Sequence, residues 1–139
     1  MIQGFWQTDY ELLAPIRASG CALLSSIYLA ARDFTQQDCN DMYNGLLGVK
    51  FIEQDCTIDD WDKVLNSIAP NMHFKAKSNQ FYVCAVNERE IIKWYLSNVK
   101  EDHFTVGNGA SKIAWDSMNR PDIMSKYATF VEKVVVTVA

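Results

Sequence analysis

The chain has 139 residues, enough for one domain to bury a core, and its 49% hydrophobic and 22% charged residues are typical of an ordinary folded protein. A net charge of -4 gives no broad positive field, which disfavours nucleic acid as a partner. The sequence has neither an export signal nor an apolar run that could span a membrane, so we expect one cytoplasmic domain over residues 1–139 with no membrane insertion.

Three helices are predicted in the first half of the chain. The first covers residues 21–33 and is apolar on nearly every face, which is typical of a buried central helix. The second covers residues 35–48 and begins with a threonine cap followed by an acidic first turn. The third follows Thr57, which has a capping-box spacing to Asp60, and it ends before Pro70.

The second half of the chain is predicted to contain strands and one more helix. Residues 81–86 are β-branched and aromatic, as in a strand, whereas residues 88–99 place five apolar side chains on one helical face. Residues 103–118 read as two strands joined at an Asn-Gly pair, a strong hairpin signal. Residues 130–139 predict a further strand. Helices therefore precede antiparallel strands, which is an α+β order.

The four cysteines are predicted to be free thiols. They stand at least 17 residues apart with no C-x-x-C pair, so neither their spacing nor the two histidines favours a zinc site. The acidic cluster at residues 59–62 is interpreted as the start of a helix, where carboxylates complement the helix dipole. We therefore expect no metal and no cofactor.

Cys21 is the cysteine best placed for chemistry. The sequence predicts it in the first turn of the buried helix, where unpaired backbone N–H groups and the positive end of the dipole favour a thiolate. A small buried hydrophobic side chain is the alternative interpretation of the same residue. The other three cysteines are predicted inside a helix, before a helix and within a strand, so they lack this placement.

His103 and Asp116 are the candidate partners of Cys21. His103 begins a predicted strand after an acidic stretch, so we expect its ring at the sheet edge facing a cleft, with an exposed loop histidine as the alternative. Asp116 ends the partner strand, where its carboxylate would accept the ring N–H and fix the tautomer. Asn119 and Asp122 are close competitors for that role.

The segments GCALLSS around Cys21 and HFTVGNGASKIAWDS from His103 resemble papain-like cysteine peptidases, most closely the bacterial type that cleaves double-glycine leader peptides of bacteriocins. In that family a helix carries the nucleophilic cysteine at its N-terminus, a strand opens with the histidine, and an aspartate ends the next strand. The resemblance implies a papain-like α+β fold in a bacterial or phage protein, with the cysteine-bearing central helix packed on a C-terminal antiparallel sheet. It also implies that Cys21, His103 and Asp116 form a catalytic triad.

The chain departs from this family at the residue that usually supplies an oxyanion donor. The family usually has a glutamine about six residues before the cysteine, and this chain has Pro15 there. Gln7 and Gln3 lie further upstream and would reach the site only through a loop. Arg17 is a nearer cationic substitute, with a surface arginine as the alternative interpretation. These three residues are the oxyanion candidates.

Functions from different classes remain open on the sequence alone. The resemblance favours a thiol hydrolase, a peptidase or amidase acting on a peptide or protein substrate through a Cys-His-Asp triad. The absent glutamine favours instead a catalytically silent relative that serves as a protein-binding module. An unrelated interaction protein would use aromatic residues such as Trp6 and Tyr10 as contact surfaces. The oligomeric state is not indicated by any pattern.

Overall fold

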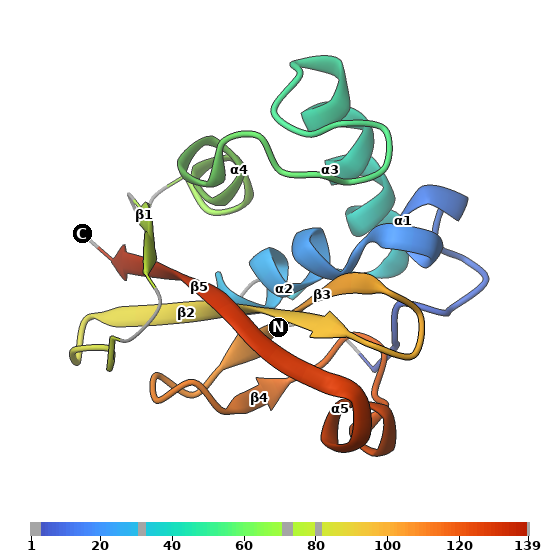
Figure 1. Ribbon diagram of the computed structural model, residues 1–139. Coiled ribbons are helices and arrows are strands. Elements are labelled where there is room, and N and C mark those ends of the chain that lie inside the picture. The colour runs from blue at the N-terminus through green and yellow to red at the C-terminus, as the bar shows by residue number, and fades with distance from the viewer. Residues whose placement is uncertain (1–3, 31–32, 71–73, 80–81, 139) are drawn as a thin grey trace.

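Helices occupy the first half of the chain in the computed structural model, which describes residues 4–30, 33–70, 74–79 and 82–138. Four of the helices lie on one face of the sheet, and a fifth lies on the other side beside the last strands (Figure 1). The helices are α1 (Ala14–Ser19), α2 (Cys21–Leu29), α3 (Gln36–Gly48), α4 (Trp61–Ile68) and α5 (Pro121–Tyr127).

The second half of the chain forms one antiparallel sheet of five strands in the order β1-β5-β2-β3-β4. The strands are β1 (Phe74–Asn79), β2 (Glu88–Leu96), β3 (Glu101–Gly107), β4 (Ile113–Trp115) and β5 (Ala128–Val138). Each neighbouring pair is antiparallel, and β5, the last strand in sequence, lies between β1 and β2. The predicted α+β class, with helices first and an antiparallel sheet last, is confirmed.

Three helices of the first half, α2, α3 and α4, agree with the predicted ones apart from their ends, whereas α1 was not predicted. α2 is buried at eight of its nine residues, as expected for a central helix, but it ends at Leu29 rather than at residue 33. α3 has the predicted threonine cap, and its capping box joins Thr35 and Asp38. The third predicted helix begins later than expected, because Asp60 itself is the N-cap and accepts the Lys63 N–H at 3.1 Å.

The predicted helix over residues 88–99 is wrong, because residues 88–96 form the strand β2. This strand pairs with β5 along its length and with β3 over residues 91–96, so most of its backbone is paired within the sheet. Ile91 and Ile92 are adjacent and both fully buried, which shows that both faces of the sheet are covered here. A strand buried on both faces loses the alternating pattern, and its apolar residues then also fit a helical face.

The other predicted strands have different outcomes. The part of the expected strand at 81–86 that the structure describes, residues 82–86, is not a strand, and Val83 and Val86 are exposed. The hairpin after residue 103 is confirmed, since β3 pairs with β4 and the Asn108 N–H donates to the Lys112 carbonyl at 2.8 Å. The final strand also forms, but it starts at Ala128, two residues before the expected position.

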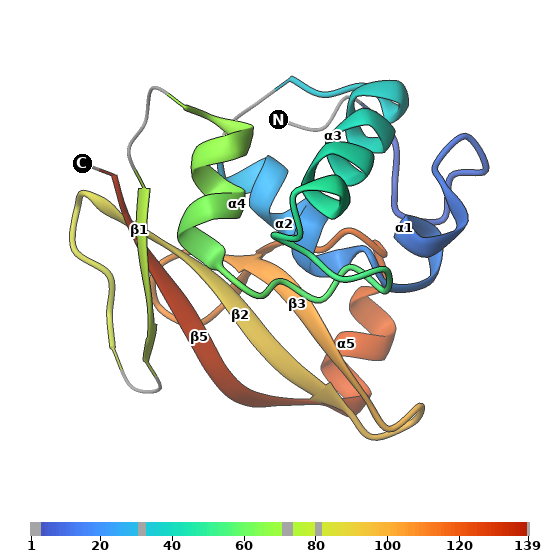
Figure 2. The same ribbon diagram turned by 90° about the horizontal axis from the view of Figure 1, so that it is seen from above.

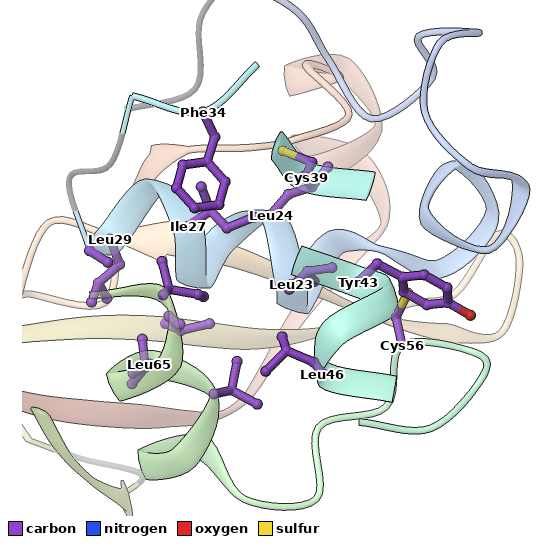
Figure 3. Close-up of a cluster of buried hydrophobic side chains, with 14 of the residues drawn as sticks. Leu23, Leu24, Ile27, Leu29, Phe34, Cys39, Tyr43, Leu46, Cys56 and Leu65 are labelled. Carbon is purple, nitrogen blue, oxygen red and sulfur yellow. The ribbon is translucent and has the colours of Figure 1, made fainter. Parts of the chain in front are cut away.

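The hydrophobic core fills the space between the helices and the sheet. Figure 3 shows Leu23, Leu24 and Ile27 of α2 among side chains from α3 and α4, such as Leu46 and Leu65. Each of these side chains is almost inaccessible to solvent, and burial of one such side chain contributes about 1.5–3 kcal/mol. Figure 2, seen from above, shows α2 between the other helices and the sheet. This packing fixes the position of the first residue of α2, Cys21.

Candidate functional site

Cys21 is the first residue of α2 and follows directly on α1. The two helices meet at Gly20, whose N–H donates to the Ile16 carbonyl at 2.8 Å. A Cβ atom at position 20 would overlap the backbone and side chain of Ile16, so this close approach requires glycine. Cys21 is buried, with 8% of its surface exposed, and it lines a cavity at the N-terminal end of α2. The predicted placement of Cys21 at a helix start is confirmed.

His103 lies in β3, two residues after the strand begins, and it is paired with Trp94 of β2. β4 pairs with β3 only at Val106 and Gly107, so within the described residues no strand lies on the other side of His103. The ring is buried and lines the same cavity as Cys21. The alternative of an exposed loop histidine is therefore wrong.

Asp116 follows β4 directly and contacts the ring of His103. The distance from His103 Nε2 to Asp116 Oδ1 is 2.7 Å, and both side chains are over nine-tenths buried. The carboxylate also accepts backbone N–H groups, from Met118 at 3.1 Å and from Arg120 at 3.4 Å. These bonds hold the carboxylate in place opposite the imidazole.

The charges in this group stabilise one another. Burial acts to lower the pKa of His103, but hydrogen bonds and charge interactions with Asp116 and Cys21 outweigh it and raise the pKa to about 9. For Asp116, burial acts to raise the pKa, but the hydrogen bond and charge of His103 outweigh it and the pKa is lowered. The Asp116 carboxylate and the His103 imidazole thus each favour the charged form of the other.

The two other candidates for the third position lie away from the imidazole. Asn119 has a positive φ of 50° in the turn after Asp116, and its backbone N–H donates to the Asp116 carbonyl at 3.0 Å. Asp122 is exposed and forms two hydrogen bonds with the Arg120 guanidinium, at 3.1 and 3.2 Å. Among the three candidates, Asp116 is the one in hydrogen-bond contact with His103.

Gln7 is the oxyanion candidate that reaches the cavity. It is 3% exposed, and its Nε2 donates to the Arg17 carbonyl at 3.3 Å. The guanidinium-bearing residue Arg17 is itself exposed and is not among the described residues that line the cavity. Gln3 lies outside the described residues. The N-terminal segment thus brings a buried amide to the cavity that Cys21 also lines.

Ser117 is a buried residue of the site that the sequence analysis did not identify. Its hydroxyl donates to Gln7 Oε1 at 2.6 Å, and its carbonyl accepts the Gln7 backbone N–H at 2.8 Å. Ser117 is adjacent to Asp116, so the amide of Gln7 and the carboxylate are held by neighbouring residues of one turn. No sequence signal marks this serine, because its partner is 110 residues away.

The cavity that contains Cys21 and His103 has a volume of about 890 Å³. Its apolar lining includes Trp61 of α4 and Phe104 of β3, whose rings lie 5.7 Å apart. A second hollow, between α3 and α4, has a volume of about 660 Å³ and no cysteine or histidine among its described lining residues. The thiol, the imidazole and the carboxylate therefore coincide with the larger cavity.

The other three cysteines have no histidine partner in the described structure. All four are free thiols. Burial raises the pKa of Cys39 and, with a contribution from the Cys21 charge, that of Cys56 to about 12. Burial and the Glu90 carboxylate raise the pKa of Cys84 to about 11. These three thiols are thus held in the protonated, unreactive form.

The part of the chain that the structure describes contains neither a cluster of metal ligands nor a long apolar helix. No group of three or more His, Cys, Asp and Glu side chains there could hold a metal ion. Within the same residues, no helix combines the length and the apolar character needed to cross a membrane.

The fold and the site define an α+β protein with a buried thiol, imidazole and carboxylate in one cavity. The chain belongs to the family described as Protein of unknown function, DUF261, which matches residues 2–135. No curated protein matches the chain. No solved structure matches it either.

Proposed function

We propose that this protein is a papain-like thiol hydrolase, a peptidase or amidase with Cys21, His103 and Asp116 as its catalytic triad. The observation that carries the proposal is the position of His103, which is bonded to Asp116 at 2.7 Å and lines the same cavity as Cys21, whose thiol contributes to raising the pKa of the imidazole. Further support comes from the arrangement of a cysteine-bearing buried helix on an antiparallel sheet, and from the motifs that resemble the peptidases of double-glycine leader peptides. A reducing compartment such as the cytoplasm would keep the thiol available.

In the proposed reaction, Cys21 attacks the carbonyl carbon of the scissile bond. Nε2 of His103 is bonded to Asp116, which leaves Nδ1 to exchange a proton with the thiol. The raised pKa of His103 favours an imidazolium, which is the form that can give a proton to the leaving amine. The imidazolium then gives its proton to the leaving amine, and a thioester remains on Cys21. A water molecule, deprotonated by His103, hydrolyses the thioester and restores the thiol.

The developing oxyanion would be stabilised by two N–H donors. One is the backbone N–H of Cys21, at the positive end of α2. The other is the side-chain amide of Gln7, whose oxygen accepts the Ser117 hydroxyl and one of whose two N–H groups is directed to the Arg17 carbonyl, so one N–H is left for the oxyanion. Gln7 would thus replace the glutamine that the family usually carries just before the cysteine.

The test of this proposal is the reactivity of Cys21 measured by iodoacetamide labelling and peptide mapping. The expected result is that Cys21 at pH 6.5 reacts roughly 10 to 100 times faster than a free cysteine, whose pKa is about 8.5. His103→Gln should remove the advantage, whereas Asn119→Ala should keep it. Turnover of a peptide library should disappear in Cys21→Ala. A Cys21 that reacts no faster than free cysteine, or turnover that persists in Cys21→Ala, would overturn the proposal.

The second candidate is a silent relative that binds a peptide or protein in the same cavity. The observation in its favour is the burial of Cys21, which is only 8% exposed, together with Pro15 at the usual glutamine position. It differs from the first candidate in the pKa of the Cys21 thiol, which would lie at or above about 8.5. A thiol titration therefore separates the two.

Most of the aromatic residues considered for an interaction surface have structural contacts. Trp61 packs on Phe104, and the Trp94 indole N–H donates to Thr105 at 2.9 Å. Trp6 stacks on Trp115, with ring centroids 6.2 Å apart, although 41% of its surface remains exposed. These contacts account for Trp61 and Trp94 through packing of the fold, whereas Tyr10 is 81% exposed.

A further inference from the structure

The cavity that contains Cys21 is lined by five carboxylates and, apart from His103, by two basic side chains. The basic residues are Lys93 and Arg120, and the carboxylates are Asp55, Glu101, Asp102, Asp116 and Glu132. Since Asp116 is engaged by His103, four acidic residues remain to set the charge that an entering substrate meets. The lining is therefore more acidic than basic.

Both basic side chains are already paired with carboxylates. Lys93 Nζ lies 3.5 Å from Asp102 Oδ2, and Lys93 is also opposite Glu132 in the register of β2 and β5. Arg120 is held by Asp122 through two hydrogen bonds. Neither cation is thus available to attract an acidic substrate.

Asp55 and Glu101 have no ion pair with a cation among the described residues. Asp55 lies between α3 and α4, next to Cys56, whose thiol is close enough to Cys21 to be affected by its charge. It accepts the Thr57 backbone N–H, and the hydrogen bonds of Thr57 lower the pKa of Asp55. Glu101 begins β3, two residues before His103. Two carboxylates without an ion pair among the described residues therefore line the cavity, Glu101 beside His103 on β3 and Asp55 beside Cys56.

Apolar side chains complete the wall of the cavity. Trp61, Leu96 and Val99 line it, and Val99 is about half exposed. The long aliphatic part of a lysine or arginine side chain can pack on such a surface while its charged end remains near carboxylates and water. An acidic side chain would meet the same surface without a free cation.

We propose that the cavity selects peptide substrates that carry a lysine or arginine side chain close to the bond that Cys21 attacks. The proposal rests on the function proposed above. Asp55 and Glu101 provide the attraction, and the neutralised Lys93 and Arg120 leave acidic peptides without a partner. Asp55 and Glu101 are both exposed to solvent, so their attraction acts through water and weakens as salt is added.

The electrostatic part of this proposal is measurable on Cys21 without knowledge of the natural substrate. Two methanethiosulfonate reagents, one with a trimethylammonium group and one with a sulfonate, each convert a thiol to a mixed disulfide and release methanesulfinate. The ratio of their rates at Cys21, located by peptide mapping, is compared with the ratio for free cysteine. We expect the ratio of the trimethylammonium rate to the sulfonate rate to be roughly tenfold higher at Cys21 than for free cysteine. Added salt should reduce this difference.

Matched variants assign the preference to the cavity. Asp55→Asn and Glu101→Gln should each reduce the ratio by roughly threefold to fivefold. Asp41→Asn makes the same change in net charge on α3, outside this cavity, and should leave the ratio unchanged. Peptide acyloxymethyl ketones with Lys, norleucine or Glu beside the reactive ketone should inactivate the protein in that order of rate.

Each outcome bears on one of the two proposals. If Cys21 is labelled rapidly but without preference for the cation, or if Asp41→Asn lowers the ratio as much as Asp55→Asn, the substrate proposal is overturned and the proposed nucleophile is retained. Equal inactivation by the Lys and Glu ketones would also overturn the substrate proposal. If Cys21 reacts with neither reagent faster than a buried thiol such as Cys39, both proposals fail.

Discussion

His103 Nε2 and Asp116 Oδ1 are 2.7 Å apart, joined across the β3–β4 hairpin. Both side chains are buried, so the charge interaction is weakly screened by water. Asp116 is also held by two backbone N–H groups of its own turn. The carboxylate is therefore a fixed partner that determines which ring nitrogen faces Cys21.

The first prediction concerns Asp116→Asn. An amide cannot stabilise an imidazolium as a carboxylate does, so the pKa of His103 should fall and less imidazolium should remain in the cavity with Cys21 at pH 6.5. We expect the rate of Cys21 alkylation at pH 6.5 to fall at least about tenfold. The control is Asp122→Asn, which removes an exposed carboxylate of the same turn region. Equal rates in Asp116→Asn and the unmodified protein would contradict the assigned role.

The second prediction concerns stability between pH 6 and 8. The pKa of His103 is raised in the folded state to about 9, from 6.5, so its contribution is fully present below pH 6.5 and is lost as pH rises towards 9. From pH 6.5 to 8 the free energy of unfolding should fall by about 2 kcal/mol. Urea denaturation at each pH measures it. The buried cysteines add a loss of the same sign only at higher pH, since their ordinary pKa is 9.0.

The matched variant for this measurement is His103→Gln, which carries no titrating group at position 103. Its free energy of unfolding should be nearly independent of pH between 6 and 8. A slope as steep as that of the unmodified protein would assign the pH dependence to other groups.

The third prediction concerns the pair Ser117 and Gln7. Ser117→Ala leaves the buried Gln7 Oε1 without its hydroxyl donor, at a cost of about 1–3 kcal/mol in the free energy of unfolding. The freed amide should also lose its fixed orientation, so any peptidase turnover should show a lower kcat with little change in KM. Ser125→Ala, at an exposed hydroxyl on α5, is the control and should alter neither quantity. Unchanged stability and kcat in Ser117→Ala would refute the positioning role.

The fourth prediction concerns an ion pair buried within the sheet. Lys133 Nζ lies 2.7 Å from Glu90 Oε1, and neither side chain is exposed to solvent. Glu90 Oε2 accepts the backbone N–H groups of Gly109 and Ser111, at 3.0 and 2.9 Å. The carboxylate thus joins β5 to the hairpin loop. Lys133→Met should lower the free energy of unfolding by about 3–5 kcal/mol, because it leaves a buried carboxylate without a counter-charge.

The double variant Glu90→Gln with Lys133→Met separates charge from hydrogen bonding. It removes both charges but keeps a side-chain oxygen for the hairpin N–H groups, so it should be more stable than Lys133→Met alone. Chemical denaturation of the single and double variants measures the difference. A double variant less stable than Lys133→Met would show that the unpaired buried charge is not the main cause of the lower free energy of unfolding.

The sequence alone determined the elements whose signals are local. Thr35 and Asp38 are three residues apart and cap α3, as their spacing predicts, and the Asn-Gly pair lies in the hairpin loop. The placement of Cys21 at a helix start was predicted for the same reason, since the apolar pattern of α2 begins there. These features depend on neighbouring residues and need no information about distant ones.

Only the tertiary structure decided the features that depend on distant partners. The segment 88–96 is a strand because β3 and β5 satisfy its backbone on both sides, although its apolar spacing also suits a helix. Asp116 contacts His103, whereas Asp122 contacts Arg120. The conformation of the chain after β4 decides which of these candidates is the partner of the imidazole. Gln7 is held at the cavity by its bonds to Ser117. These two residues are 110 positions apart, so no sequence spacing indicates their contact. Burial and backbone pairing are properties of the packed chain. They therefore decide between a helix and a strand, or between two candidate site residues, where the local sequence pattern fits both.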